Sequence, residues 1–167
     1  MNIALLNELN FYVIVPGTIT TLTVNSIAFA VNGEDIGDIT MSTTTVDTST
    51  GLVSISLSED IDYDHLTFTL NITKNGTAET IVGTAYDVDR ILLYTSVRLL
   101  NLYGKACNDT ITLNKILLLD FKYNMFQLAL ENSRYYDILV YLPELLRSIE
   151  IATTRSTSYV TSNDYVY

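Results

Sequence analysis

Residues 66–104 read LTFTLNITKNGTAETIVGTAYDVDRILLYTSVRLLNLYG, and within this stretch the apolar pattern changes from that of a strand to that of a helix. Apolar and polar residues alternate in LTFTLNIT, as they do on a half-buried β-strand. Lys74-Asn75-Gly76 follows, and a returning segment runs from Ala78 to Ala85. Because Asn and Gly accept the positive φ angles of a tight turn, this pattern predicts a β-hairpin.

The second part of the same stretch predicts a helix from about Val88 to Tyr103. Asp87 can cap its first turn, and Gly104 is a typical helix end. Apolar residues recur three and four positions apart, which indicates one buried stripe. That stripe is expected to contain Ile91, Leu92, Val97 or Tyr94, Leu99 and Leu102.

Two more helical segments follow. The first runs from about Thr112 to Asn132, and its apolar stripe is wide enough for more than one face to be covered. The second runs from Tyr135 to Ile149 and contains Pro143. Because proline removes a backbone hydrogen bond and clashes with the preceding turn, this segment is either one kinked helix or two helices that meet at Leu142.

Residues 1–85 are predicted to form a β subdomain rich in Thr and Ser. Strands are expected at 11–15, 18–24, 26–31, 36–46 and 51–58 in addition to the hairpin, with a tight turn at Asn32-Gly33. Short antiparallel strands at this spacing are typical of an immunoglobulin-like sandwich or a small barrel. The predicted fold class is therefore α+β, with this subdomain followed by a helical subdomain over residues 86–152.

The last segment, residues 153–167, reads TTRSTSYVTSNDYVY and loses the helical periodicity. One interpretation is a disordered tail. The other is an extended C-terminal arm that adds to the sheet edge of a neighbouring molecule. In that case the residues that bind the partner would be Tyr159, Val160, Tyr165, Val166 and Tyr167.

The charge of the chain is concentrated in its first half. Residues 1–85 contain one Lys and ten Asp or Glu, a net charge of −9, whereas the rest contains eight basic and nine acidic residues, a net charge of −1. Nucleic acids are bound mainly through Lys and Arg on phosphates. The sequence therefore predicts no sequence-specific nucleic-acid partner, and only 17% of the residues are charged, which suits a surface that is covered by partners.

The residues needed for catalysis are scarce. Cys107 is the only cysteine and His65 the only histidine, so one subunit can form neither a disulfide, nor a thiolate metal cluster, nor a site built on two histidines. We expect Cys107 to be a structural residue. The sequence contains no phosphate-binding loop and no hydrolase motif, so we predict no enzyme, no cofactor and no metal.

An acidic run at residues 59–64, EDIDYD, allows a sharper hypothesis. Asp60, Asp62 and Asp64 could surround a calcium ion, but an EF-hand loop would need Gly and Glu where this chain has His65 and Asn71. A charged loop that discourages pairing of sheet edges is the simpler interpretation. The N-terminal residues lack the basic start of a signal peptide, and the apolar stretches are interrupted too early to cross a membrane.

Taken together, these features resemble the small virion structural proteins of tailed bacteriophages. The chain is short, poor in Cys and rich in Thr, Asn and Tyr, and its helices with a trailing arm are similar to head–tail connector or neck ring proteins of crAss-like phages. The resemblance implies a homo-oligomeric ring in the virion, assembled in the host cytoplasm, with the portal or other neck and tail proteins as partners.

Two other functions are compatible with the same residues. A capsid decoration or head-fibre anchoring protein would display the β subdomain outward and use the helices and tail as an anchor. A non-viral adhesion or carbohydrate-binding module would need export, for which the N-terminus provides no signal. The first two functions differ in copy number per particle and in the direction in which the β subdomain points.

Overall fold

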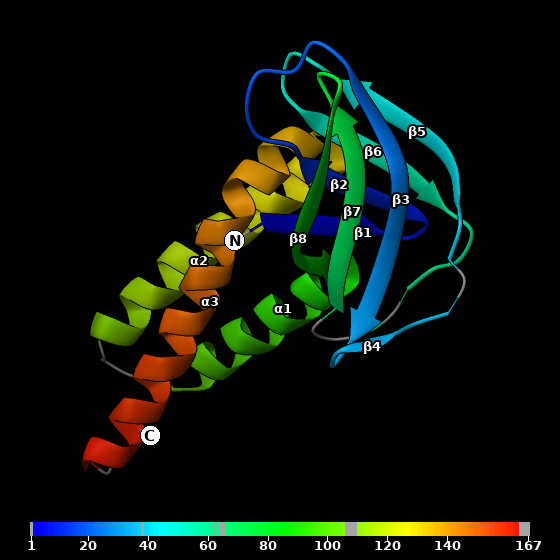
Figure 1. The fold of residues 1–167 in the computed structure, drawn as a ribbon. Helices are drawn as coiled ribbons and strands as arrows, with labels where there is room; N and C mark the ends of the chain where they lie inside the picture. Colours follow the sequence, from blue (N-terminus) through cyan, green and yellow to red (C-terminus); the bar gives the residue numbers. More distant parts are fainter. Residues whose placement is uncertain (1, 38, 62, 64–65, 106–109, 164–167) are drawn as a thin grey trace. The chain divides into compact units, whose positions relative to one another are not determined.

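The computed structural model describes residues 2–37, 39–61, 63, 66–105 and 110–163. The chain divides into two compact units, Met1–Arg90 and Ile91–Tyr167, which we call the β unit and the helical unit. The predicted α+β class is confirmed: within the described residues, eight strands form one curled mixed sheet, and three helices follow (Figure 1).

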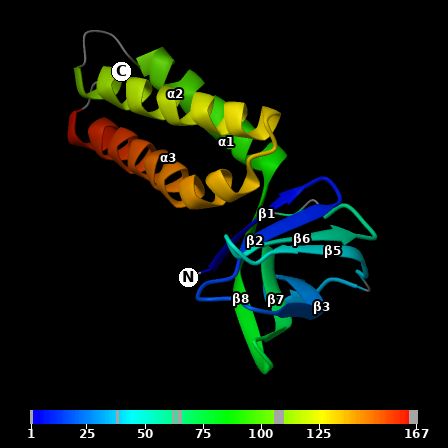
Figure 2. The ribbon, with the colours of Figure 1, turned by 90° about the horizontal axis from the view of Figure 1, so that it is seen from above.

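The sheet has the strand order β4-β3-β7-β8-β1-β2-β6-β5. Its strands are β1 Asn2–Asn7, β2 Asn10–Ile14, β3 Leu22–Val31, β4 Glu34–Asp35, β5 Met41–Asp47, β6 Leu52–Leu57, β7 Leu66–Lys74 and β8 Thr77–Asp87. In the described part of the chain these strands form a single sheet, curled into a half-barrel, instead of the two packed sheets of a sandwich (Figure 2).

The strand β1 lies in the middle of the sheet, and the sequence analysis placed no strand there. It pairs with β2 in the antiparallel sense and with β8 in the parallel sense. Ala4, Leu5 and Leu6 are all buried, so this strand is covered on both faces. A strand of that kind has a continuous apolar run instead of alternation, and for this reason the alternation test does not detect it.

Two further strand predictions were wrong in their bounds. The segments 18–24 and 26–31 do not form separate strands, because β3 continues through a bulge between Val24 and Ser26. The expected long strand over 36–46 is replaced by β4 and β5. Gly37 lies between these two strands with φ 58°, a left-handed conformation that a regular strand does not contain.

Both predicted tight turns are confirmed. Asn32 and Gly33 have φ angles of 53° and 85°, and Asn75 and Gly76 have φ angles of 52° and 82°. Positive φ at both central residues is the requirement of the type I′ turn, whose twist matches that of the flanking strands. These two turns set the registers of β3 with β4 and of β7 with β8.

The core of the β unit lies on one face of the curled sheet. At its centre the ring of Phe11 meets the rings of Phe68 and Phe29 edge-on, with centroid distances of 5.2 Å and 5.7 Å. Edge-to-face pairs of this kind add to the energy of burial. The buried Leu and Ile side chains of this core include Leu6, Ile27, Ile55, Leu57, Leu66, Leu70 and Ile72.

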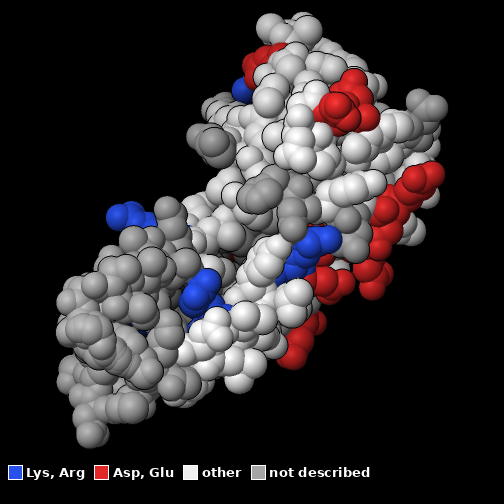
Figure 3. Space-filling model, turned by 90° about the horizontal axis from the view of Figure 1, so that it is seen from below, with Lys and Arg blue, Asp and Glu red and all other residues white. Residues whose placement is uncertain are grey.

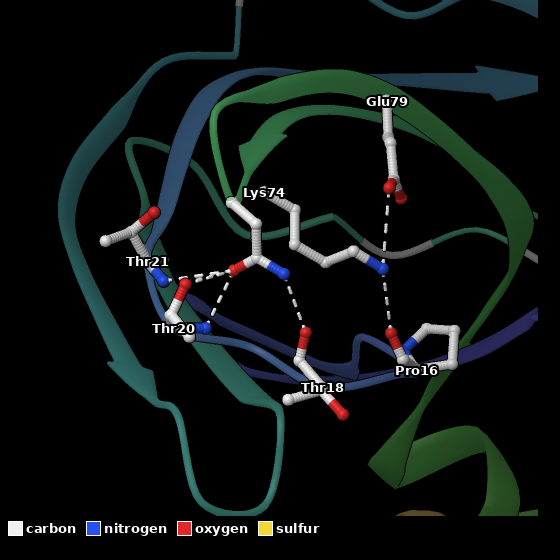
Figure 4. Close-up of polar contacts among 7 residues, drawn as sticks. Pro16, Thr18, Thr20, Thr21, Lys74 and Glu79 are labelled. Carbon is white, nitrogen blue, oxygen red and sulfur yellow. Dashed lines mark hydrogen bonds and ion pairs between the residues drawn. The ribbon is translucent and has the colours of Figure 1, made fainter.

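The side chain of Asn75 holds the long β2–β3 connection. Its Oδ1 accepts hydrogen bonds from the backbone N–H and the hydroxyl of Thr20, at 2.7 Å and 2.8 Å. Its Nδ2 donates to the carbonyl oxygen of Thr18 at 2.8 Å. Beside it, Lys74 Nζ donates to the carbonyl oxygen of Pro16 at 3.0 Å and pairs with Glu79 (Figure 4).

We predict that Asn75→Gly lowers the free energy of unfolding by about 2 kcal/mol, since it removes several hydrogen bonds worth about 0.5–1.5 kcal/mol each. Glycine keeps the positive φ angle of the turn, so the loss reports on the side chain alone. Asn32→Gly is the matched control, because Asn32 has the same φ and lies in the other hairpin turn. Urea denaturation compares the two variants; equal stability would show that Asn75 does not hold the connection.

The helices are α1 Val88–Lys105, α2 Thr110–Glu131 and α3 Tyr135–Asn163. The predicted N-cap of α1 is confirmed, because the backbone N–H of Arg90 donates to Asp87 Oδ2 at 3.3 Å. Of the two interpretations at Pro143, the structure has a single helix that contains it. The turn between α2 and α3 ends on Ser133, with φ 54°.

The predicted extended arm is wrong for residues 153–163, whose backbone continues α3. Extension of an existing helix adds one hydrogen bond for each residue that is ordered, whereas the low helix propensity of Thr and Ser costs only about 0.5 kcal/mol for each residue. Tyr159 and Val160 are therefore helical, whereas Tyr165, Val166 and Tyr167 lie outside the described residues.

Candidate functional site

Each helix of the helical unit carries one row of buried side chains. The rows are Ile91, Thr95, Leu99 and Leu102 in α1, Ile116, Leu119 and Phe126 in α2, and Ile138, Leu139, Leu142 and Leu145 in α3. Apart from the adjacent pair Ile138 and Leu139, these residues are three, four or seven positions apart, which is the spacing of one helix face. The polar member, Thr95, donates its hydroxyl to the carbonyl oxygen of Ile91 at 2.7 Å, so its polar group is satisfied inside the helix.

Helix α1 carries a second apolar row that is exposed. We call it the α1 outer face, and it consists of Leu93, Val97, Leu100 and Tyr103. Leu100 is the most exposed of these, with 70% of its surface accessible. Leu93, Val97 and Leu100 follow one another at steps of four and three residues, which is the spacing of a helix seam that packs against another helix.

Helix α2 has an exposed apolar row of the same kind. We call it the α2 outer face, and it consists of Leu117, Leu118, Phe121, Met125 and Leu128. The last four of these residues are separated by three, four and three positions, again the a and d pattern of helix seams. Apolar residues thus cover both sides of α2, which agrees with the wide stripe predicted from its sequence.

The α2 outer face continues into a groove between α2 and α3, two helices that lie side by side (Figure 2). The groove has a volume of about 400 Å³. Met125 and Leu128 of α2 line it together with Tyr136 and Val140 of α3. Its lining is mostly apolar, with Arg134 and Asp137 near the turn between the helices. Such a groove suits apolar side chains of a partner more than a charged ligand.

Two polar contacts hold the helices in this arrangement. The hydroxyl groups of Ser96 in α1 and Tyr123 in α2 are 2.9 Å apart and share a hydrogen bond. Lys122 in α2 donates to Glu144 in α3 at 3.0 Å. That contact holds the pKa of the Glu144 carboxyl below its ordinary value. The contribution of the ion pair to stability is therefore present at neutral pH and is lost only as the pH falls through the lowered pKa.

Few charges interrupt the two outer faces. Between Leu93 and Tyr103 the only charged residue is Arg98, and between Leu117 and Leu128 the charged residues are Asp120 and Lys122. Figure 3 shows one side of the molecule, on which acidic and basic side chains lie in small scattered groups among uncharged surface. A face with so little charge is suited to burial against another apolar surface.

The predicted partner-binding residues are described only in part. Tyr159 and Val160 belong to the helical backbone of α3, and Tyr165 to Tyr167 lie outside the described residues. The outer faces themselves were not predicted, and Val97 and Tyr94 were expected as alternatives in the buried stripe of α1. The one sequence signal for the exposed faces was the width of the α2 stripe.

The acidic run of the β unit is described only in part. Glu59 and Asp60 are exposed and line a shallow hollow of about 350 Å³ together with Ile36, Ile39 and Tyr63. Asp62, Asp64 and His65 lie outside the described residues, as does Cys107. Among the residues that are described, no three His, Cys, Asp or Glu side chains are grouped so that they could hold a metal ion.

None of the helices described in the structure is both long and apolar enough to cross a membrane. In comparisons with known proteins, no family model, no curated protein and no solved structure matches this chain.

Proposed function

We propose that this chain is a structural subunit of a tailed-phage virion and forms a ring in the neck, the head–tail connector below the portal. In this function the chain does no chemistry: it joins neighbouring subunits, and through them the portal or other neck and tail proteins, while the genome passes through the ring. The proposal combines the resemblance in composition and element order with the exposed apolar faces of the helical unit.

The observation that carries the proposal is the pair of outer faces. The two faces together contain nine large apolar residues, four on α1 and five on α2, each at least one third exposed. Monomeric proteins rarely expose contiguous apolar patches larger than a few hundred Å². Faces of this size on two helices support a protein that is covered by other subunits when it works.

The acidic β unit supports the same function by its charge. Its net charge of −9 over residues 1–85 repels DNA phosphates. If the unit lines the ring, this repulsion lets DNA slide past without sticking. If it faces outward, the same charge keeps the assembled particle from associating with others.

A second function, capsid decoration or anchoring of a head fibre, is favoured by the division of the chain into two units. The helical unit would then anchor on the shell through its apolar faces, and the acidic β unit would be displayed. The two functions use the same apolar faces and differ in the number of copies that a particle needs.

The number of copies in a purified particle tests the proposal. Quantitative mass spectrometry, with labelled peptides of this chain, the portal protein and the major capsid protein, measures the three ratios together. We expect about one copy of this chain for each portal subunit, because a ring that has the same rotational symmetry as the portal has the same number of subunits. A ratio close to that of the major capsid protein would contradict the neck ring and support decoration, and absence from the particle would contradict both.

A further inference from the structure

We infer that the α1 outer face of one copy packs against the α2 outer face of the next copy, so that the subunits join head to tail. This inference rests on the proposed function as a self-assembling structural subunit and names the partner of its exposed faces. The partner is a second copy of this chain, and the contact joins two unlike surfaces.

The two outer faces are not buried against each other within one copy. Leu93 and Val97 each come two residues after a buried residue of α1, Ile91 and Thr95. Two steps of an α-helix turn by about 200°, so these side chains point to the opposite side of the helix. The same holds in α2, where Phe121 follows the buried Leu119 and Leu128 follows the buried Phe126.

Contacts inside the chain leave both outer faces exposed. Ser96 of α1 meets Tyr123 of α2, and Lys122 of α2 meets Glu144 of α3. With these bonds formed, the residues of the α1 outer face are still 44–70% exposed and those of the α2 outer face 39–68% exposed. Burial of these faces therefore needs another molecule.

The two outer faces are similar in length, and both are apolar. The α1 outer face spans residues 93–103 and the α2 outer face residues 117–128, which correspond to about 15 Å and 17 Å of helix. Both outer faces carry apolar residues at the spacing of a helix seam. The apolar side chains of one face can therefore pack into the spaces between the side chains of the other. Neither face brings a cluster of like charges that would repel its counterpart.

The area of the two faces is sufficient for a specific contact. A fully covered aromatic side chain buries about 150–250 Å², and the Leu, Met and Val side chains of these faces bury less. Nine large apolar side chains that are about half exposed therefore present a total that approaches about 1,000 Å². Specific protein interfaces begin at about this total area. A contact between one α1 outer face and one α2 outer face therefore reaches the lower limit for a stable interface, and each subunit of a ring makes two such contacts.

Contact between unlike faces is favoured because it covers both faces of every copy. If α2 packed against α2 of a second copy, the dimer would leave both α1 outer faces in water, and the reverse pairing would leave both α2 outer faces in water. Head-to-tail contacts leave no face uncovered when they close into a ring. A heterologous contact is also what a ring requires, whereas a contact between like faces stops at two copies.

Engineered cysteines at the middle of each face test the inference in the full-length chain. Val97→Cys and Met125→Cys are made separately in a Cys107→Ser background, so that each protein has a single thiol. Both positions are exposed, so the fold is expected to tolerate the changes. On oxidation, a mixture of the two variants should yield roughly tenfold more disulfide-linked dimer than either variant alone, because a disulfide needs Cα atoms within about 7 Å.

Val82→Cys is the matched control, since Val82 is an exposed apolar residue of β8 outside both faces. A mixture of Val82→Cys with Met125→Cys should yield no more linked dimer than either protein alone. Three results would overturn the inference: dimers that form equally in the single-variant samples, dimers that form equally with the control, or no dimers from a chain that sediments as a monomer. The copy number per particle is measured independently, so the inference can fail while the neck ring stands.

Discussion

Gly83→Ala is expected to lower the free energy of unfolding of the β unit by about 3 kcal/mol, because the new methyl group would collide with the neighbouring strand. A Cβ at this position would overlap the carbonyl oxygen of Asn2 and lie 2.8 Å and 2.9 Å from its carbonyl carbon and Cβ. Gly83 and Asn2 are paired in the register of β8 with β1. Because the obstacle is backbone, it cannot rotate away as a side chain would.

Gly76→Ala is the control for this change. Gly76 also lies in a β-hairpin of the same unit, but a Cβ there meets nothing within 4 Å, and the only penalty comes from its φ of 82°. That penalty is about 1 kcal/mol. Urea denaturation followed by circular dichroism compares the variants, and hydrogen exchange of β1 amides shows whether this strand detaches. If Gly83→Ala costs no more than Gly76→Ala, β1 does not pair with β8 at this position.

Phe68→Ala should cost about 3–5 kcal/mol, since it removes a large side chain and leaves a cavity. Phe68 is 1% exposed and packs edge-on against Phe11, which in turn packs against Phe29. These three rings come from β7, β3 and β2. The strands β7 and β3 are neighbours, whereas β2 lies three strands away from β7 in the sheet order, so the loss affects contacts across the curled sheet. The expected result is a fall in the melting temperature by many degrees.

The control for the core is Val82→Ala, which shortens an exposed side chain of β8. Such surface changes usually alter stability by less than about 0.5 kcal/mol. Phe68→Leu should lie between the two, because leucine fills part of the space but loses the ring contacts. If Phe68→Ala were no more destabilising than Val82→Ala, the core would have to lie on the other face of the sheet.

Local signals predicted the parts of this protein that depend on neighbouring residues. The Asn-Gly turns, the β7–β8 hairpin and the Asp87 cap follow from the φ angles and hydrogen bonds that these residues prefer. The helical rows around Leu99 and Leu142 follow from the spacing of apolar residues. None of these features needs information from a distant part of the chain.

The missed strand β1 shows where such signals fail. Five of its six residues are paired with β8, roughly eighty positions later, and the burial of Ala4, Leu5 and Leu6 on both faces removes the alternation that marks other strands. The extended arm failed for a related reason. Thr and Ser in residues 153–163 have weak preferences, and the preceding helix outweighs them.

The candidate site was likewise predictable in part from the sequence and decided in part by the tertiary structure. The sequence already indicates that α2 carries more apolar residues than one buried row needs, because composition and spacing are properties of the segment alone. Which row is buried is decided by tertiary packing: Ile91 and Leu119 are covered, whereas Leu93 and Phe121 are left in water. A side chain is buried only where a second surface covers it. Only the packed helices therefore show which apolar faces remain for a partner.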